Sequence, residues 1–130
     1  MELHPHAIGE KVRICVEHFA AQVQREISGR AKAMIVTRSR LHAVRYRLAV
    51  DKYLAERGYP FKALAAFSGH VEDGGRSYTE AGMNGFPETQ TAKTFERHEH
   101  RFLIVANKFQ TGFDQPLLHT MYVDKKLGGV

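Results

Sequence analysis

Two short and continuous apolar runs constrain the fold of this chain more than any other feature. They are residues 33–37, Ala-Met-Ile-Val-Thr, and residues 102–106, Phe-Leu-Ile-Val-Ala. A strand that faces solvent on one side alternates apolar and polar residues, whereas a strand covered on both faces is apolar throughout. Both runs therefore predict strands of a parallel sheet that is buried on both faces.

The segments between these runs predict further elements. Apolar residues recur at steps of three and four from residue 10 to Ile27, which predicts an amphipathic helix that ends at Gly29. Ser39 can cap a second helix that runs to Arg57, before Gly58 and a proline. Additional elements are expected at residues 61–68 (strand), 89–98 (short helix) and 120–123 (strand).

Two segments are expected to be loops, at residues 69–88 and 107–118. The first contains five glycines and a proline, which are too many breakers for a regular element. The resulting order of helices and strands predicts an α/β fold, in which a single domain has a parallel sheet flanked by helices.

Length and composition narrow the class of protein. The chain has 130 residues, of which 43% are hydrophobic and 25% are charged, as in one folded domain. No apolar run approaches the roughly 18 residues that span a bilayer, and the first residues lack the apolar core of a signal peptide. A cytoplasmic location without membrane contact is therefore expected. The single cysteine, Cys15, excludes an internal disulfide and is expected to be an inert thiol.

The positive charge is concentrated in the first half of the chain. Residues 1–70 contain 12 basic and 6 acidic residues, whereas residues 71–130 contain 7 and 8. This asymmetry favours a polyanionic partner such as nucleic acid, although a basic face without any partner would give the same counts.

Polar and basic residues follow each predicted strand. Ligands of parallel α/β sheets bind beyond the carboxyl ends of the strands, so these residues are candidate contacts for phosphate. The alternative is that they only cap helices and turn loops. The set comprises residues 37–40, 68–70, 107–114 and 124–126.

Two histidine pairs could in principle bind a metal ion. They are His4 with His6 and His98 with His100. The first pair lies near a terminus and the second lies in a charged stretch, so no metal site is expected.

Three stretches of the sequence resemble superfamily 2 helicases. The stretch RFLIVANKFQTGFDQPLLHTMYVDK resembles motif V, especially that of the motor (R) subunits of type I restriction enzymes. KAMIVTRSRLHAVRY resembles motif IV, and YTEAGMNGFPE resembles a loop characteristic of these R subunits. The resemblance runs from about His4 to Val130. It implies that residues 1–130 are the second RecA-like lobe of a DNA translocase and a fragment of a longer protein.

The resemblance also implies which residues contact DNA. Those after the motif IV strand would approach the DNA backbone, and a small pair after the next strand would meet a phosphate. A polar group after the motif V strand would lie near the nucleic acid. These positions are Thr37, Arg38, Ser39, Ser68, Gly69, Asn107, Lys108 and Thr111.

Motif V would further contribute to ATP binding. In the family, the carboxylate at Asp114 lies by the cleft between the lobes and can accept a hydrogen bond from the ribose, while Gly112 allows a close approach of the backbone. Asp114 could instead cap a turn before Pro116, and Phe113 is expected in the core.

Two motifs of a complete motor do not occur in the sequence. There is no GxxxxGKS/T phosphate loop and no arginine-rich motif VI, which we expect beyond Val130. ATP and Mg²⁺ would therefore be used by the full-length motor, and neither would be bound by this chain alone.

The resemblance implies several partners. They are double-stranded DNA, the first RecA-like lobe of the same protein, and the modification and specificity subunits. Two alternatives remain, namely a lobe of another superfamily 2 helicase or translocase, and a non-catalytic module that binds nucleic acid.

Overall fold

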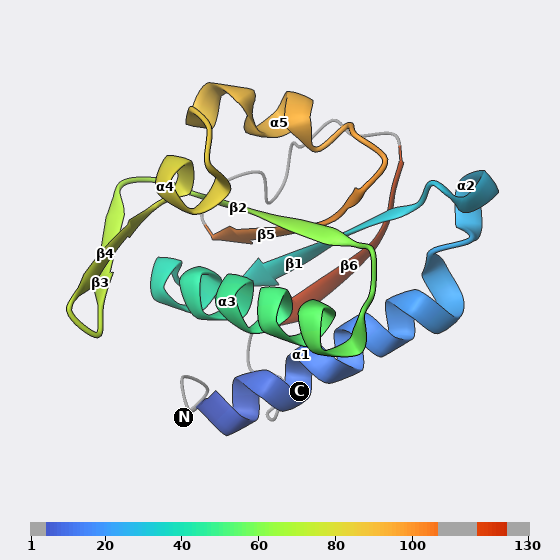
Figure 1. Cartoon of the computed structure of the whole chain (residues 1–130), viewed down its shortest axis with the longest axis horizontal. Helices are drawn as coiled ribbons and strands as arrows, with labels where there is room; N and C mark the ends of the chain where they lie inside the picture. The colour runs from blue at the N-terminus through green and yellow to red at the C-terminus, as the bar shows by residue number, and fades with distance from the viewer. Residues whose placement is uncertain (1–4, 107–116, 125–130) are drawn as a thin grey trace.

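The computed structural model describes residues 5–106 and 117–124. Its centre is a sheet of four strands, all parallel, in the order β2-β5-β1-β6 (Figure 1). The strands are β1 (Lys32–Thr37), β2 (Lys62–Phe67), β5 (His100–Ala106) and β6 (Leu118–Asp124). All four predicted strands are confirmed, and the α/β architecture agrees with a RecA-like fold.

Helices cover both faces of the sheet. Ile35 and Ile104, which are paired in neighbouring strands, lie on the face that packs against α1 (Pro5–His18) and α3 (Arg40–Arg57). The residues directly before them in the two strands, Met34 and Leu103, point to the opposite face and pack with Phe95. That face lies beneath α4 (Glu80–Asn84), the 3₁₀ turn η2 (Glu88–Gln90) and α5 (Thr91–Thr94) (Figure 1). The two predicted doubly buried strands are thus confirmed.

The first helix differs from the prediction at its carboxyl end. The buried stripe includes Val12, Val16 and Phe19, as expected. The regular helix α1 ends at His18, and a π-helical turn, η1 (Phe19–Val23), follows it. The prediction that the helix continues to Ile27 is wrong, because Ile27 has a φ of 52° in the short turn α2 (Glu26–Gly29) and its side chain is exposed.

Helix α3 begins and ends where its sequence predicts. The Ser39 hydroxyl oxygen accepts a hydrogen bond from the backbone N–H of His42, which satisfies one donor of the first turn. Gly58 ends the helix in the left-handed conformation, with a φ of 72°.

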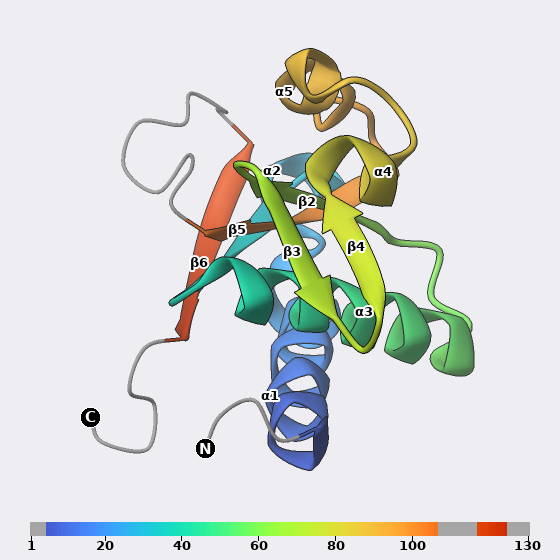
Figure 2. The same ribbon diagram turned by 90° about the vertical axis from the view of Figure 1, so that its left-hand side faces the viewer.

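The prediction of a loop at residues 69–88 is wrong. The segment contains an antiparallel hairpin, β3 (His70–Asp73) and β4 (Arg76–Thr79), followed by α4. Gly74 and Gly75 form its two-residue turn with φ values of 61° and 82°, as a type I′ turn requires. The hairpin lies beside the amino-terminal half of α3 (Figure 2), and Arg45 pairs with Asp73 at 2.9 Å.

Helix α4 covers the outer edge of β2. The Asn84 amide donates to the carbonyl oxygen of Ala65 at 2.8 Å and accepts from the Ala65 N–H at 2.9 Å. The carboxylate of Glu80 accepts from the N–H of Phe67 at 3.0 Å. Glu80 and Asn84 are four residues apart in the helix, which corresponds to a rise of about 6 Å, and their partners on β2 are two residues apart, or about 6.6 Å. Because the two spacings match, both side chains reach the edge of β2 from one face of α4.

The short helix predicted at residues 89–98 is confirmed only in part, because helical structure ends at Thr94. No helix within the described segments is both long and apolar enough to cross a membrane.

Candidate nucleic-acid interface

The carboxyl ends of β1 and β2 lie at the same edge of the sheet, beside the first turn of α3. Arg40 connects them, because its Nη1 donates a hydrogen bond to the carbonyl oxygen of Ser68 at 3.1 Å. Gly69 lies against the same guanidinium, and a Cβ atom at this position would lie 2.7 Å from Nη1. The structure thus brings together two groups of predicted DNA contacts, which are about thirty residues apart in the sequence.

Thr37 is buried within this edge. Its side chain is 3% exposed, and its hydroxyl donates to the carbonyl oxygen of Val105 at 2.9 Å, with the Ser39 carbonyl oxygen also within 3.1 Å. The hydroxyl therefore holds the loop after β1 against β5. A direct contact of this side chain with DNA, as the resemblance implies, is not available in the described conformation.

Ser39 is engaged in capping α3. Its hydroxyl oxygen accepts from the His42 backbone N–H at 3.1 Å and lies 2.7 Å from Nδ1 of the same histidine. Because α3 begins at this edge, the positive end of the dipole of this 18-residue helix lies here. The first-turn N–H groups that have no acceptor within the helix lie here as well. Such an end favours a nearby phosphate.

Arg38 lies above a buried carboxylate. Its Nη2 is 3.8 Å from Oδ1 of Asp124, and the Lys11 ammonium donates to the same oxygen at 3.2 Å. The Arg38 side chain remains 33% exposed, whereas Asp124 is 3% exposed. Two cations around one carboxylate leave the cluster with a net positive charge.

Sequence reasoning missed part of this cluster. Asp124 was recognisable as a residue after a strand, and its register position beside Thr37 places it at this edge. Lys11 lies 113 residues from Asp124 in the chain, and no local pattern could have paired the two.

Burial perturbs two protonation equilibria near Asp124. It raises the pKa of Tyr46, with a further contribution from the Asp124 carboxylate. Burial also raises the pKa of the Cys15 thiol to about 12. The thiol therefore stays protonated near neutral pH, as expected for an inert cysteine.

The predicted motif V contacts Asn107, Lys108, Thr111, Gly112 and Asp114 lie outside the described residues. Strand β5, which precedes them, lies between β2 and β1 in the sheet. Among the side chains that the structure describes, no group of three or more histidines, cysteines or carboxylates could hold a metal ion.

Comparisons with known proteins agree with the resemblance carried by the motifs. Residues 75–129 match the family model described as type I restriction enzyme subunit R domain 3. The chain is also similar to a putative type I restriction enzyme MjaVIIP endonuclease subunit from Methanocaldococcus jannaschii, with 29% identity. That alignment covers 98% of this chain but only 13% of the relative. The expected resemblance to type I R subunits is thereby confirmed.

Proposed function

Taking the confirmed resemblance to type I restriction enzyme R subunits as the premise, we propose that this chain is the second RecA-like lobe of an ATP-dependent DNA translocase. In this role the lobe contributes motif IV and motif V contacts to duplex DNA and ATP. The observation that carries the proposal is the Arg40–Ser68 hydrogen bond, which joins the loops after β1 and β2 into one basic edge.

The groups at this edge suit the recognition of a phosphate backbone. Arg38 and Lys11 supply positive charge, and the amino end of α3 supplies backbone donors. None of these groups selects a base, so binding would depend on salt and not on sequence. A motor that moves along DNA requires this kind of contact.

The lobe would hydrolyse ATP only together with other parts of a motor. Phosphoryl transfer needs a phosphate cradle, a metal ion and an arginine in one site. The resemblance assigns Gly112 and Asp114 to the ATP side of motif V, and the remaining groups would come from the first lobe and motif VI. The modification and specificity subunits would then direct the motor to its DNA.

The proposal can be tested in an R subunit that contains this region. Arg38→Ala removes one proposed phosphate contact, so half-maximal stimulation of ATP hydrolysis should need about fivefold more DNA, equivalent to about 1 kcal/mol. Lys52→Ala is the matched control, because Lys52 is an exposed cation in the second half of α3, away from the sheet edge. Equal DNA requirements for the two variants would refute the assignment of the edge.

Asp114→Asn tests the ATP side of the proposal. The substitution retains size but removes charge, and loss of a charged hydrogen bond of about 1.5 to 3 kcal/mol should slow turnover about ten- to a hundredfold. The thermal midpoint should stay unchanged. If Asp114 instead caps a turn before Pro116, melting temperature falls and turnover per folded molecule stays normal.

A further inference from the structure

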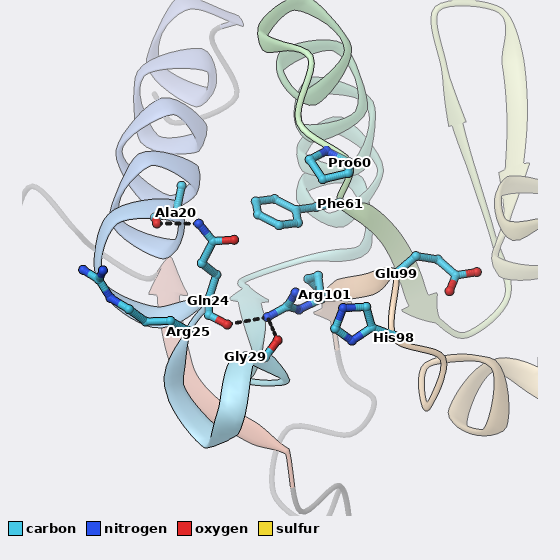
Figure 3. A pocket seen from close by; sticks show the side chains of 9 residues that line it. All are labelled: Ala20, Gln24, Arg25, Gly29, Pro60, Phe61, His98, Glu99 and Arg101. Atoms are coloured by element: carbon cyan, nitrogen blue, oxygen red, sulfur yellow. Dashed lines mark hydrogen bonds between the residues drawn. The ribbon is translucent and has the colours of Figure 1, made fainter.

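A pocket lies at the opposite, amino-terminal edge of the sheet. It has a volume of about 460 Å³ and is formed by the end of the first helical segment, the turn before β1, and the residues that begin β2 and β5 (Figure 3). This edge is remote from the proposed DNA interface, so the inference below is independent of the proposed function.

Arg101 forms the floor of this pocket. Its side chain comes from β5, and the residue is 4% exposed. Nε donates to the carbonyl oxygen of Ala31 at 2.9 Å, and Nη2 donates to those of Gln24 and Gly29 at 2.8 and 3.2 Å. A guanidinium has five N–H groups, so both N–H groups of Nη1 remain without an acceptor among the residues that the structure describes.

Aromatic rings hold the guanidinium in this position. The centroids of the Phe19 and Phe61 rings lie 5.2 and 5.5 Å from Cζ of Arg101. Phe61 also lines the pocket, together with Pro60 and Ala20 (Figure 3). One wall of the pocket is therefore apolar, and its floor is a fixed cation.

No carboxylate within the described ranges neutralises this buried charge. Glu99 lines the pocket, but its side chain is directed away from Arg101 (Figure 3), and its Oε2 lies 3.6 Å from Nε of Arg97. Lys32 is a second fully buried cation, and its ammonium donates to two carbonyl oxygens, at Arg97 and His100. Burial, and to a lesser extent the charge of Arg101, lowers the pKa of Lys32 to about 8. The region thus has a positive potential that an anion would relieve.

We propose that this pocket binds a carboxylate attached to a small apolar group. The carboxylate would accept hydrogen bonds from Nη1 of Arg101, with the His98 ring close to the guanidinium (Figure 3), and the apolar group would lie against Phe61. A singly charged oxyanion fits better than a phosphate dianion. Only one edge of the Arg101 guanidinium is open, and the negative charge of Glu99, which also lines the pocket, would repel a dianion more strongly.

The test is a titration of the isotope-labelled protein with sodium benzoate, followed by two-dimensional NMR at constant ionic strength. Benzoate should shift the Nε–H signal of Arg101 and the backbone amide signal of Phe61 in a saturable manner, with a millimolar dissociation constant. Benzamide, which has the same shape without the charge, should leave both signals in place. N-acetylglutamate α-amide, as a mimic of an acidic side chain, shows whether the site prefers a small acid or a carboxylate on a protein.

Variants of the rim keep the test decisive, since replacing Arg101 would also remove the bonds that hold the turn before β1. His98→Ala, which removes a ring that lines the pocket beside Arg101 (Figure 3), should weaken benzoate binding about three- to fivefold. Arg30→Ala, an exposed cation near the same turn that does not line the pocket, should have no effect. The proposal is overturned by shifts that do not saturate, by tighter binding of inorganic phosphate, or by equal effects of the two variants.

Discussion

Arg40 on the first turn of α3 donates a hydrogen bond from Nη1 to the carbonyl oxygen of Ser68, at a distance of 3.1 Å. This contact fixes the loop after β2 relative to the loop after β1. Because the predicted phosphate contacts Arg38, Ser39 and Ser68 lie on these two loops, they form one rigid surface.

Gly69 is required by the conformation of this surface. Its φ is +70°, and a Cβ atom would lie 2.7 Å from Nη1 of Arg40. Gly69→Ala should therefore lower the free energy of unfolding by about 1 to 2 kcal/mol, measured by urea denaturation, and should also weaken DNA binding. Gly9→Ala is the control, because Gly9 lies in α1 with open space around its Cβ direction. That variant should be as stable as the wild type or slightly more stable. Equal stabilities of the Gly69 and Gly9 variants would contradict this interpretation.

Asn84 is expected to be a major contributor to stability, although it is polar and partly exposed. Its amide satisfies both backbone groups of Ala65 on the edge of β2. Asn84→Ala leaves these groups unpaired and should lower the free energy of unfolding by about 2 to 3 kcal/mol. Gln90→Ala, at an exposed position before α5, should change it by less than about 0.5 kcal/mol. Chemical denaturation measures both, and a loss at Asn84 no larger than that at Gln90 would exclude the edge-covering role.

Lys32 gives the stability a defined pH dependence. Burial lowers its pKa to about 8 in the folded state, whereas an unfolded lysine titrates near 10.4. Between these values the unfolded state binds more protons, so the contribution of Lys32 to stability increases as pH rises. The difference in unfolding free energy between wild type and Lys32→Met should therefore shift in favour of the wild type by about 1 to 2 kcal/mol between pH 7.5 and 10.

The comparison of the two proteins isolates this effect. Cys15 and Tyr122 have raised pKa values, so their contributions to stability decrease as pH rises, but they are present in both proteins and cancel. Urea denaturation at several pH values provides the measurement. Parallel stability curves for the two proteins would show that Lys32 keeps an ordinary pKa.

Much of the fold could be predicted from the sequence because its strongest signals are local. The apolar runs of β1 and β5 indicate strands covered on both faces, and Ser39 and Gly58 mark the ends of α3. The hairpin at residues 70–79 was missed because Gly74 and Gly75 were interpreted as breakers of regular structure. A pair of glycines between two short polar strands is equally a signal for a tight hairpin turn.

The candidate site was less predictable, because its geometry depends on contacts between distant segments. The parallel sheet places the residues after each strand at one edge, so Arg38 and Ser68 could be proposed from their positions alone. The burial of the Thr37 hydroxyl and the link between Lys11 and Asp124 depend on how strands and helices pack. Similarly, the role of Glu80 and Asn84 is visible only once β2 lies beside α4.

The most direct test of the proposed DNA interface is the salt dependence of duplex binding, measured by fluorescence anisotropy with the wild type and with Arg38→Ala. Wild-type binding should be weak, independent of sequence and steeply reduced by salt. Arg38→Ala should weaken binding about fivefold and reduce the slope of log K against log salt by about 1. Arg30→Ala, which removes an exposed cation at the opposite edge of the sheet, should leave affinity and slope unchanged. Equal losses for the two variants, or a wild-type affinity that does not respond to salt, would contradict the assignment of this edge to DNA.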